Sequence, residues 1–412
     1  MKSFKQYLSE EKNTHMTHIE DKVIYGGVNG TRQAILALRS LRDMLSGKQD
    51  GNVSVKWDGA PAVFAGTDPR DGKFFVAKKG IFNKNPVVYK TEKDIDDDGV
   101  TGDLARKLKM SLKHFANLGI KGVIQGDLLF TKSDLKSEKI DGLDYITFHP
   151  NTIVYAVEKG GKDSKEIERA KIGVVWHTTY TGETFETMRA SYGVDVTKLK
   201  KTSAVWQQDA MLRDLTNVAT LSAQETKRVD ANLSRAGKIF NQISSSTLRT
   251  LEQNQKLAQL IETFNNTFVR SGTIIGDTDQ HVRNLINWIE NKYQKEIDKR
   301  KTERGKQTQR DALSKILEFF SSENKKSLKR IFDLQKSIVF AKLLLINKLS
   351  EVQNIKTFVK TTNGFRSTGP EGYVAIDKLG GNAVKLVNRY EFSTKNFDPT
   401  ILKGWSKYRG TI

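Results

Sequence analysis

A long segment without proline divides this sequence and limits the folds that it can adopt. No proline occurs from Asn151 to Gly369, and from about Glu183 to Gln353 the apolar residues recur at helical spacing. Stripes of this kind are typical of helix bundles. The clearest stripes are formed by Leu257, Leu260, Ile261 and Phe264, by Val282, Leu285, Ile286 and Ile289, and by the apolar positions from Leu313 to Leu349. We therefore predict an all-α insertion over residues 183–353.

The segments on either side of this insertion have the pattern of β structure. Short apolar and β-branched runs, bounded by Gly, Pro, Asp and Asn, recur from Val53 to Tyr180 and again after Thr357. A helical pattern from Arg32 to Leu45 precedes them, and we expect this helix to pack under the first strand. The sequence thus predicts an α+β protein with antiparallel sheets, in which residues 23–182 and 354–412 form one domain.

The composition excludes several classes of function. The chain has no cysteine, so disulfides, thiolate nucleophiles and Cys-ligated zinc are excluded. No apolar run approaches the length of about 18 residues that a membrane helix needs, so we expect no membrane partner. The net charge of +20 favours a polyanionic partner, because lysine and arginine that neutralise phosphates release counterions. A generally basic soluble protein is the alternative.

The segment Val53–Phe64 presents one lysine at the end of a predicted strand. The sequence alternates as a strand up to Lys56, turns through Asp58-Gly59-Ala60-Pro61, and resumes as a strand at Val63. Lys56 is therefore expected beside a tight turn.

Later predicted strands carry isolated polar groups. Lys78 and Lys79 end one strand, and Asp127 lies on another that is otherwise apolar. A carboxylate on an apolar strand is costly unless it is paired or lies in a site, which makes Asp127 a candidate site residue. Each lysine taken singly also fits a solvated strand end.

Two aromatic residues also lie on predicted strands before the insertion. Phe148 ends the strand from Tyr145, and Trp176 lies in an apolar strand with His177 beside it. We interpret His177 as a polar residue alternating on that strand, because no second ligand at metal-binding spacing accompanies it.

Three segments after the insertion complete the set of candidate residues. An Asn363-Gly364 turn predicts a hairpin, and Glu371-Gly372-Tyr373-Val374 follows it. The next predicted strand contains Lys385 and ends at Arg389.

Taken in order, these segments resemble the motifs of the covalent nucleotidyltransferases, the superfamily of ATP-dependent DNA and RNA ligases and mRNA capping enzymes. The correspondences are Lys56-Trp57-Asp58-Gly59 for motif I, Lys79 with Lys78 beside it for motif Ia, Gly126-Asp127 for motif III, Trp176 or else Phe148 for motif IIIa, Glu371-Gly372-Tyr373-Val374 for motif IV, and Lys385 for motif V. Motif III usually has glutamate in place of Asp127. The resemblance implies a ligase-type domain of antiparallel sheets around a nucleotide groove.

The resemblance also implies the chemistry. Lys56, in its neutral form, would attack ATP and form a lysyl-AMP. Asp127 and Glu371 would hold Mg²⁺ or Mn²⁺, with Asp127 also beside the ribose. The Trp176 ring, or else that of Phe148, would stack on the purine.

Motif V matches incompletely. Lys385 would contact the α-phosphate, but Val387 stands where the family often has a second lysine. Arg389 is the candidate that replaces it.

The resemblance favours a polynucleotide ligase with RNA rather than DNA as its substrate. Only 17 residues follow Lys395, too few for the C-terminal barrel of DNA ligases and capping enzymes. Guanylyl transfer in RNA capping is disfavoured for the same reason. A further alternative is a non-catalytic phage head-internal or nucleic-acid-binding protein with a degenerate nucleotidyltransferase fold.

Two charged or polar segments, the N-terminus and Asn291–Arg310, each fit more than one role. Residues 1–22 are polar, with little to pack, and Met1–Lys12 looks like the capsid-targeting peptides of some tailed phages, with cleavage after Leu8-Ser9-Glu10. A short helical N-terminus without that role is the alternative, so the expected location is the host cytoplasm or the virion interior. Asn291–Arg310 holds eight basic and three acidic residues, which fits either a solvated face or a nucleic-acid surface.

Overall fold

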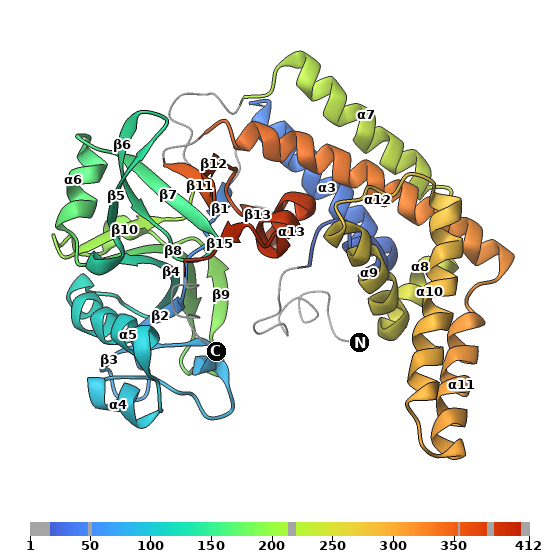
Figure 1. The fold of residues 1–412 in the computed structure, drawn as a ribbon, viewed down its shortest axis with the longest axis horizontal. Coiled ribbons are helices and arrows are strands. Elements are labelled where there is room, and N and C mark those ends of the chain that lie inside the picture. The colour runs from blue at the N-terminus through green and yellow to red at the C-terminus, as the bar shows by residue number, and fades with distance from the viewer. Residues whose placement is uncertain (1–16, 48–51, 213–219, 353–354, 377–382, 405–412) are drawn as a thin grey trace.

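The protein is an α+β structure in which three sheets adjoin a large helical region (Figure 1). This confirms the predicted α+β class, the antiparallel sheets and the helical region at this level of detail. The computed structural model describes residues 17–47, 52–212, 220–352, 355–376 and 383–404.

The first sheet has the strand order β10-β8-β4-β2-β3, with β9 paired to β8. Its strands are antiparallel except β10, which runs parallel to β8. One face of the sheet packs against α5 through a core that includes Leu128, Phe115 and Trp176. The bounds are β2 Ala62–Thr67, β3 Phe74–Ala77, α4 Glu92–Asp97, α5 Gly102–Phe115, β4 Val123–Thr131, β8 Ile172–Thr181, β9 Arg189–Tyr192 and β10 Val205–Asp209.

The second sheet covers the other face of the first. Its order is β12-β11-β7-β6-β5, with β15 paired to β11. Phe130 from the first sheet meets Phe148 from the second, with ring centroids 5.0 Å apart. The bounds are β5 Lys136–Ile140, β6 Leu143–Phe148, β7 Ile153–Glu158, α6 Lys162–Arg169, β11 Lys356–Thr361, β12 Gly364–Ser367 and β15 Ile401–Leu402. The predicted Asn-Gly hairpin is confirmed as β11 and β12.

The third sheet joins segments from both sides of the helical insertion. It has the order β1-β13-β14, with β1 Asn52–Lys56, β13 Gly372–Ile376 and β14 Ala383–Leu386. Val53, Tyr373 and Leu386 face the helices and belong to their core. Since successive side chains alternate between the faces of a strand, Lys56 and Lys385 lie on the opposite face.

The helical region is built around α12, the longest helix, which packs against α7, α10 and α3. Helix α7 begins at a capping box, because the Ser222 hydroxyl accepts from Glu225 N while the Glu225 carboxylate accepts from Ser222 N. The bounds are α2 Lys22–Tyr25, α3 Gly27–Leu45, α7 Ala223–Phe240, α8 Ser245–Gln253, α9 Gln255–Arg270, α10 Thr278–Asp298, α11 Glu303–Leu317, α12 Ser322–Leu349 and α13 Arg389–Phe397. Helices α10 and α11 project from this region as a hairpin (Figure 1).

Two expectations differ from the structure. Residues 189–192 and 205–209, within the predicted helical segment, form strands β9 and β10, because the short apolar pair Val205-Trp206 extends the first sheet instead of a helix. Residues 19–21 were expected to have little to pack, yet they are buried. Helix α3 packs against α7, α8 and α12, in a core cluster that also contains Val53.

Nowhere in the described ranges is a helix long and apolar enough to cross a membrane.

Candidate functional site

The candidate site is built on the last residue of β1 and the turn that follows it. Lys56 is the last residue of β1 and pairs with Gly372, the first residue of β13. The chain then crosses to the first sheet, where Ala60 N donates to Leu128 O at 2.9 Å and Leu128 N donates to Pro61 O at 3.1 Å. The turn between Lys56 and β2 is therefore fixed against β4.

Asp58 holds this turn from inside the protein. Its carboxylate accepts from Asn151 Nδ2 at 2.7 Å, Thr152 N at 2.8 Å and Ile153 N at 2.9 Å. Its own backbone N donates to the Tyr155 hydroxyl at 2.7 Å. With these partners and a buried side chain, Asp58 ties the turn to the start of β7, so its role in this structure is to position the loop.

Gly59 allows the turn to approach the strand that carries Asp127. A Cβ atom at position 59 would lie 2.6 Å from Asp127 Cβ and 2.8 Å from Leu128 O. Neither the backbone nor a Cβ can move away cheaply, so the close approach requires glycine at this position. The motif therefore brings the end of β1 and the middle of β4 together.

Lys56 forms an ion pair with Glu371, which directly precedes β13. Lys56 Nζ lies 2.5 Å from Glu371 Oε2, and the exposed fractions of the two side chains are 30% and 10%. Burial raises the pKa of the Glu371 carboxyl, and the positive charge of Lys56 opposes this rise. The lysine and the glutamate expected from motifs I and IV are thus in direct contact.

Lys385 lies on the same face of this sheet as Lys56. It pairs with Val374, which in turn pairs with Ser54, two residues before Lys56. Burial lowers the pKa of the Lys385 amine, and the charge of Lys56 lowers it further. The structure therefore places the expected motif V lysine beside the expected nucleophile.

Asp127 faces Lys56 from the first sheet. Burial raises the pKa of Asp127 to about 7, while the charges of Lys56 and, less strongly, Lys79 act to lower it. Lys79 starts a short 3₁₀ helix after β3. Lys56 thus contacts Glu371 and acts electrostatically on both Asp127 and Lys385.

Lys78 lies apart from this group, although it is next to Lys79. Its amine donates to Asp98 Oδ2 at 3.0 Å and lies 5.6 Å from the centroid of the Tyr89 ring. The hydrogen bond to Tyr89 and that to Asp98 raise the pKa of Lys78. Of the two lysines proposed for motif Ia, Lys79 is the one whose charge acts on Asp127.

Arg389 is held by carboxylates of the N-terminal segment. Its Nη1 donates to both carboxylate oxygens of Asp21, at 3.1 and 3.0 Å, and lies 3.6 Å from Glu20 Oε1. Glu20 also binds the buried Lys342. Arg389 starts α13 rather than ending β14. Its guanidinium therefore joins β14 to the N-terminal segment and the helices.

Neither predicted aromatic ring lies beside Lys56. The Trp176 ring is fully buried against Phe115 of α5, at 5.2 Å between centroids, and its Nε1 donates to Gln207 Oε1 at 3.1 Å. The Phe148 ring is buried between the two large sheets and stacks on Tyr155 at 5.4 Å. Both rings belong to the hydrophobic core in this structure.

His177 is a ring on β8 that faces Asp127, although its sequence pattern predicted only a polar residue alternating on the strand. Its Nε2 lies 3.7 Å from Asp127 Oδ2, and its Nδ1 lies 2.7 Å from Thr178 Oγ1. Burial lowers the pKa of His177 to about 4, with a further contribution from the charge of Lys56. The imidazole is therefore neutral at neutral pH. Side chains alternate between the two faces of a strand, so the sequence of β8 already indicated that Trp176 and His177 lie on opposite faces. This alternation is the sequence feature that could have identified His177.

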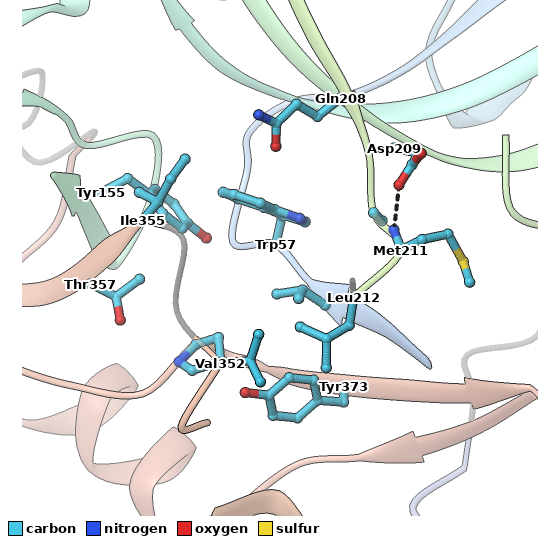
Figure 2. Close-up of a pocket in the computed structure, with 13 residues that line it drawn as sticks. Trp57, Tyr155, Gln208, Asp209, Met211, Leu212, Val352, Ile355, Thr357 and Tyr373 are labelled. Carbon is cyan, nitrogen blue, oxygen red and sulfur yellow. Dashed lines mark hydrogen bonds between the residues drawn. The ribbon is translucent and has the colours of Figure 1, made fainter. Parts of the chain in front are cut away.

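A small pocket lies behind the site, on the other side of β1 (Figure 2). It is lined by Val55 and Trp57, which flank Lys56 in the sequence, and by residues of β7, β10, β11 and β13 such as Tyr155 and Tyr373. Its volume of about 80 Å³ is well below the roughly 300 Å³ of a small-molecule site. The pocket is therefore smaller than a site for a nucleotide would need to be.

The donor set around Lys56 suits a hard divalent cation only in part. Asp127 and Glu371 supply carboxylate oxygens, the ligands that Mg²⁺ prefers. Within the described ranges there is no group of three or more His, Asp or Glu side chains arranged to hold a metal. Two protein carboxylates are nevertheless the usual number for Mg²⁺ bound together with substrate phosphates.

Comparisons with known proteins identify a family. No curated protein and no solved structure matches the chain. One family model, described as a family of unknown function (DUF6267), matches residues 13–400 and therefore spans both sheet-forming segments and the helical insertion. The chain belongs to this family of unknown function, DUF6267.

Proposed function

We propose that the protein is an ATP-dependent polynucleotide ligase with a ligase-type nucleotidyltransferase fold, acting through a covalent lysyl-AMP at Lys56. The observation that carries this proposal is the contact of Lys56, at the end of β1, with Glu371, just before β13, with Lys385 on the same face of the adjoining strand β14. These residues come from both sides of a helical insertion, so a chance match of short motifs does not account for their proximity.

The first step would transfer AMP to the protein. The Lys56 amine must lose a proton, and Glu371 Oε2 at 2.5 Å is the nearest acceptor. The amine would then attack the α-phosphorus of ATP. A P–N bond forms, the P–O bond between the α- and β-phosphates breaks, and pyrophosphate leaves with the electron pair.

The surrounding charges support this step. Lys385 and Lys79 would bind the phosphate oxygens, and their charges would stabilise the additional negative charge of the transition state. Asp127 and Glu371 would hold Mg²⁺ or Mn²⁺, which would supply further charge neutralisation. The neutral ring of His177, beside Asp127, is a better placed partner for the nucleoside than Trp176.

The later steps would join a nucleic acid. AMP passes from Lys56 to a 5′-phosphate, which releases the amine, and a 3′-hydroxyl then attacks that phosphate and expels AMP. The net charge of +20 supports a nucleic-acid substrate. RNA is the first substrate to test.

One observation favours the alternative, a non-catalytic nucleic-acid-binding protein with a degenerate site. The Arg389 guanidinium is engaged by Asp21, so it is not free to replace the missing second lysine of motif V. Phosphate binding then depends on Lys385 and Lys79 alone.

The two hypotheses differ in self-labelling. The protein is incubated with Mg²⁺ and either ATP or GTP labelled at the α-phosphate, and covalent label on the chain is measured. The ligase hypothesis expects ATP-derived label that Lys56→Ala abolishes and that Lys78→Ala leaves unchanged. A chain that stays unlabelled across pH and metals supports the non-catalytic alternative, and a preference for GTP would support guanylyl transfer.

A further inference from the structure

Helices α10 and α11 form a projecting hairpin whose tip is strongly basic. We call residues Asn291–Arg310 the basic arm; it comprises the end of α10, the connection and the start of α11. The arm holds eight Lys and Arg against three Asp and Glu, and it extends away from the sheets (Figure 1). The excess charge is therefore presented on a protruding element.

Most cations of the basic arm have no acidic partner within the described ranges. Two ion pairs occur, Lys299 with Glu296 at 2.8 Å and Arg310 with Glu303 at 2.6 Å. The cations for which the described residues provide no ion pair are Lys292, Lys295, Arg300, Lys301, Arg304 and Lys306. Of these, Lys292 lies over the Trp288 ring at 4.8 Å. The arm therefore carries positive charge that the fold itself does not neutralise.

Local helix stability does not explain all of this charge. The cations at the end of α10 suit the negative end of its dipole. Arg304 and Lys306, however, lie in the first turns of α11, where the dipole favours acidic residues. The α11 side chains that pack against the core, Ile316 with Ala312, Leu313 and Leu317, all lie after Arg310 and therefore outside the arm. These features point to a surface shaped by an external anion.

The chemistry of the arm selects a nucleic acid among polyanions. A membrane-binding helix needs a large apolar face beside its basic one. No large hydrophobic side chain from 291 to 310, a range the structure describes throughout, is exposed. A row of lysines and arginines without exposed large hydrophobic side chains between them suits a sugar-phosphate backbone.

We propose that the basic arm is a nucleic-acid-binding surface that holds the phosphate backbone of the substrate without reading its sequence. The choice of nucleic acid over another polyanion rests on the proposed function. The arm and the part of the first sheet that includes β3 project from the same side of α12 (Figure 1). A nucleic-acid strand bound to the arm would therefore lie on the same side of α12 as this part of the first sheet.

The experiment compares two triple variants of the full chain that lose the same charge. Arg300→Gln, Lys301→Gln and Arg304→Gln neutralise the arm. Lys159→Gln, Lys162→Gln and Lys165→Gln neutralise three exposed lysines at and beside α6, at the other end of the molecule. All six side chains are exposed, so both variants should fold, which circular dichroism checks.

Binding of a fluorescein-labelled single-stranded RNA is measured by anisotropy from about 50 to about 200 mM salt. We expect the arm variant to bind at least tenfold more weakly at the lowest salt. The slope of log affinity against log salt should fall by about 2, since each of three phosphates lost contributes about 0.7. The α6 variant should match the wild type.

Equal weakening of the two variants, or no binding by the wild type, overturns the proposal. Self-labelling with ATP is measured on the same preparations. If the wild type becomes labelled and the arm variant still binds RNA as tightly as the wild type, the proposed role of the basic arm is wrong and the ligase proposal is unaffected. If the arm variant binds RNA more weakly than the wild type and the wild type takes up no label from ATP, the ligase proposal is wrong and the basic arm is supported as an RNA-binding surface.

Discussion

Lys56 and Glu371 lie far apart in the sequence, yet their charged groups are in contact, with Lys56 Nζ 2.5 Å from Glu371 Oε2. The contact forms where β1 pairs with β13, so it depends on the sheet that joins the chain before and after the helical insertion. The helical insertion therefore does not separate Lys56 from Glu371 in space.

Replacing Glu371 tests whether this contact serves chemistry. Glu371→Gln removes the nearest proton acceptor and one of two candidate metal ligands while keeping the shape of the side chain. We expect the rate of self-labelling to fall by about 10²-fold, the size of effect seen when one preorganised polar group is removed from an active site. Glu138→Gln, which disrupts the pair with Lys360 on the second sheet, is the matched control and should label normally. Equal rates in the two variants would contradict the role of Glu371.

Replacing Asp58 tests whether this motif residue is structural. Asp58→Ala leaves the buried amides of Thr152 and Ile153 without their acceptor. Each such loss costs about 1–3 kcal/mol, so we expect the free energy of unfolding to fall by about 3 kcal/mol in urea denaturation. Asp58→Asn keeps one acceptor oxygen, so its free energy of unfolding should lie between those of the wild type and Asp58→Ala. A change below about 1 kcal/mol for the alanine variant would show that the turn is held by other contacts.

The partly buried carboxyl of Asp127 predicts a pH dependence of stability. Burial raises its pKa from 3.8 to about 7, so the folded protein keeps the proton at pH values where the unfolded chain has lost it. The resulting stabilisation is complete below the unfolded pKa of about 4 and is lost as pH rises through about 7. Asp127→Asn removes this group. We therefore expect the wild type to lose stability relative to Asp127→Asn between pH 4 and 7, as measured by urea denaturation. A pH-independent difference would contradict the raised pKa.

His177 and Trp176, adjacent on β8, should behave in opposite ways when they are replaced. Trp176 is fully buried, so Trp176→Ala should cost about 3–5 kcal/mol of unfolding free energy. His177 faces Asp127 and Lys56, so His177→Ala should reduce nucleotide labelling at least tenfold with little change in stability. Urea denaturation and labelling are measured on both variants. A stable Trp176→Ala protein with lost labelling would restore Trp176 as the ring at the site.

The sequence was sufficient to predict most elements and their order. Apolar periodicity identified the long helices, alternation identified β1, and short apolar runs identified β4 and β8. The motif order also predicted that Lys56, Asp127, Glu371 and Lys385 come together. In the structure Lys56 contacts Glu371, Lys385 lies on the same face of the third sheet, and the charge of Lys56 acts on Asp127.

Three features depended on tertiary packing that the sequence does not express. A strand buried on both faces is apolar at most positions, so its sequence does not show which face carries the site; this is why Trp176 was chosen over His177. The partner of Arg389, Asp21, lies in a polar segment that was predicted to have little to pack. The short run Val205–Asp209 became a strand because β8 offered it an edge.

The most direct test of the account is covalent labelling of the chain by ATP carrying a labelled α-phosphate. We predict that the wild type and Lys78→Ala, whose lysine is paired with Asp98 outside the site, become labelled in the presence of Mg²⁺. Lys56→Ala should remain unlabelled while unfolding at the same urea concentration as the wild type. Equal labelling of a folded Lys56→Ala protein, or a wild type that stays unlabelled under all conditions, would contradict the central claim.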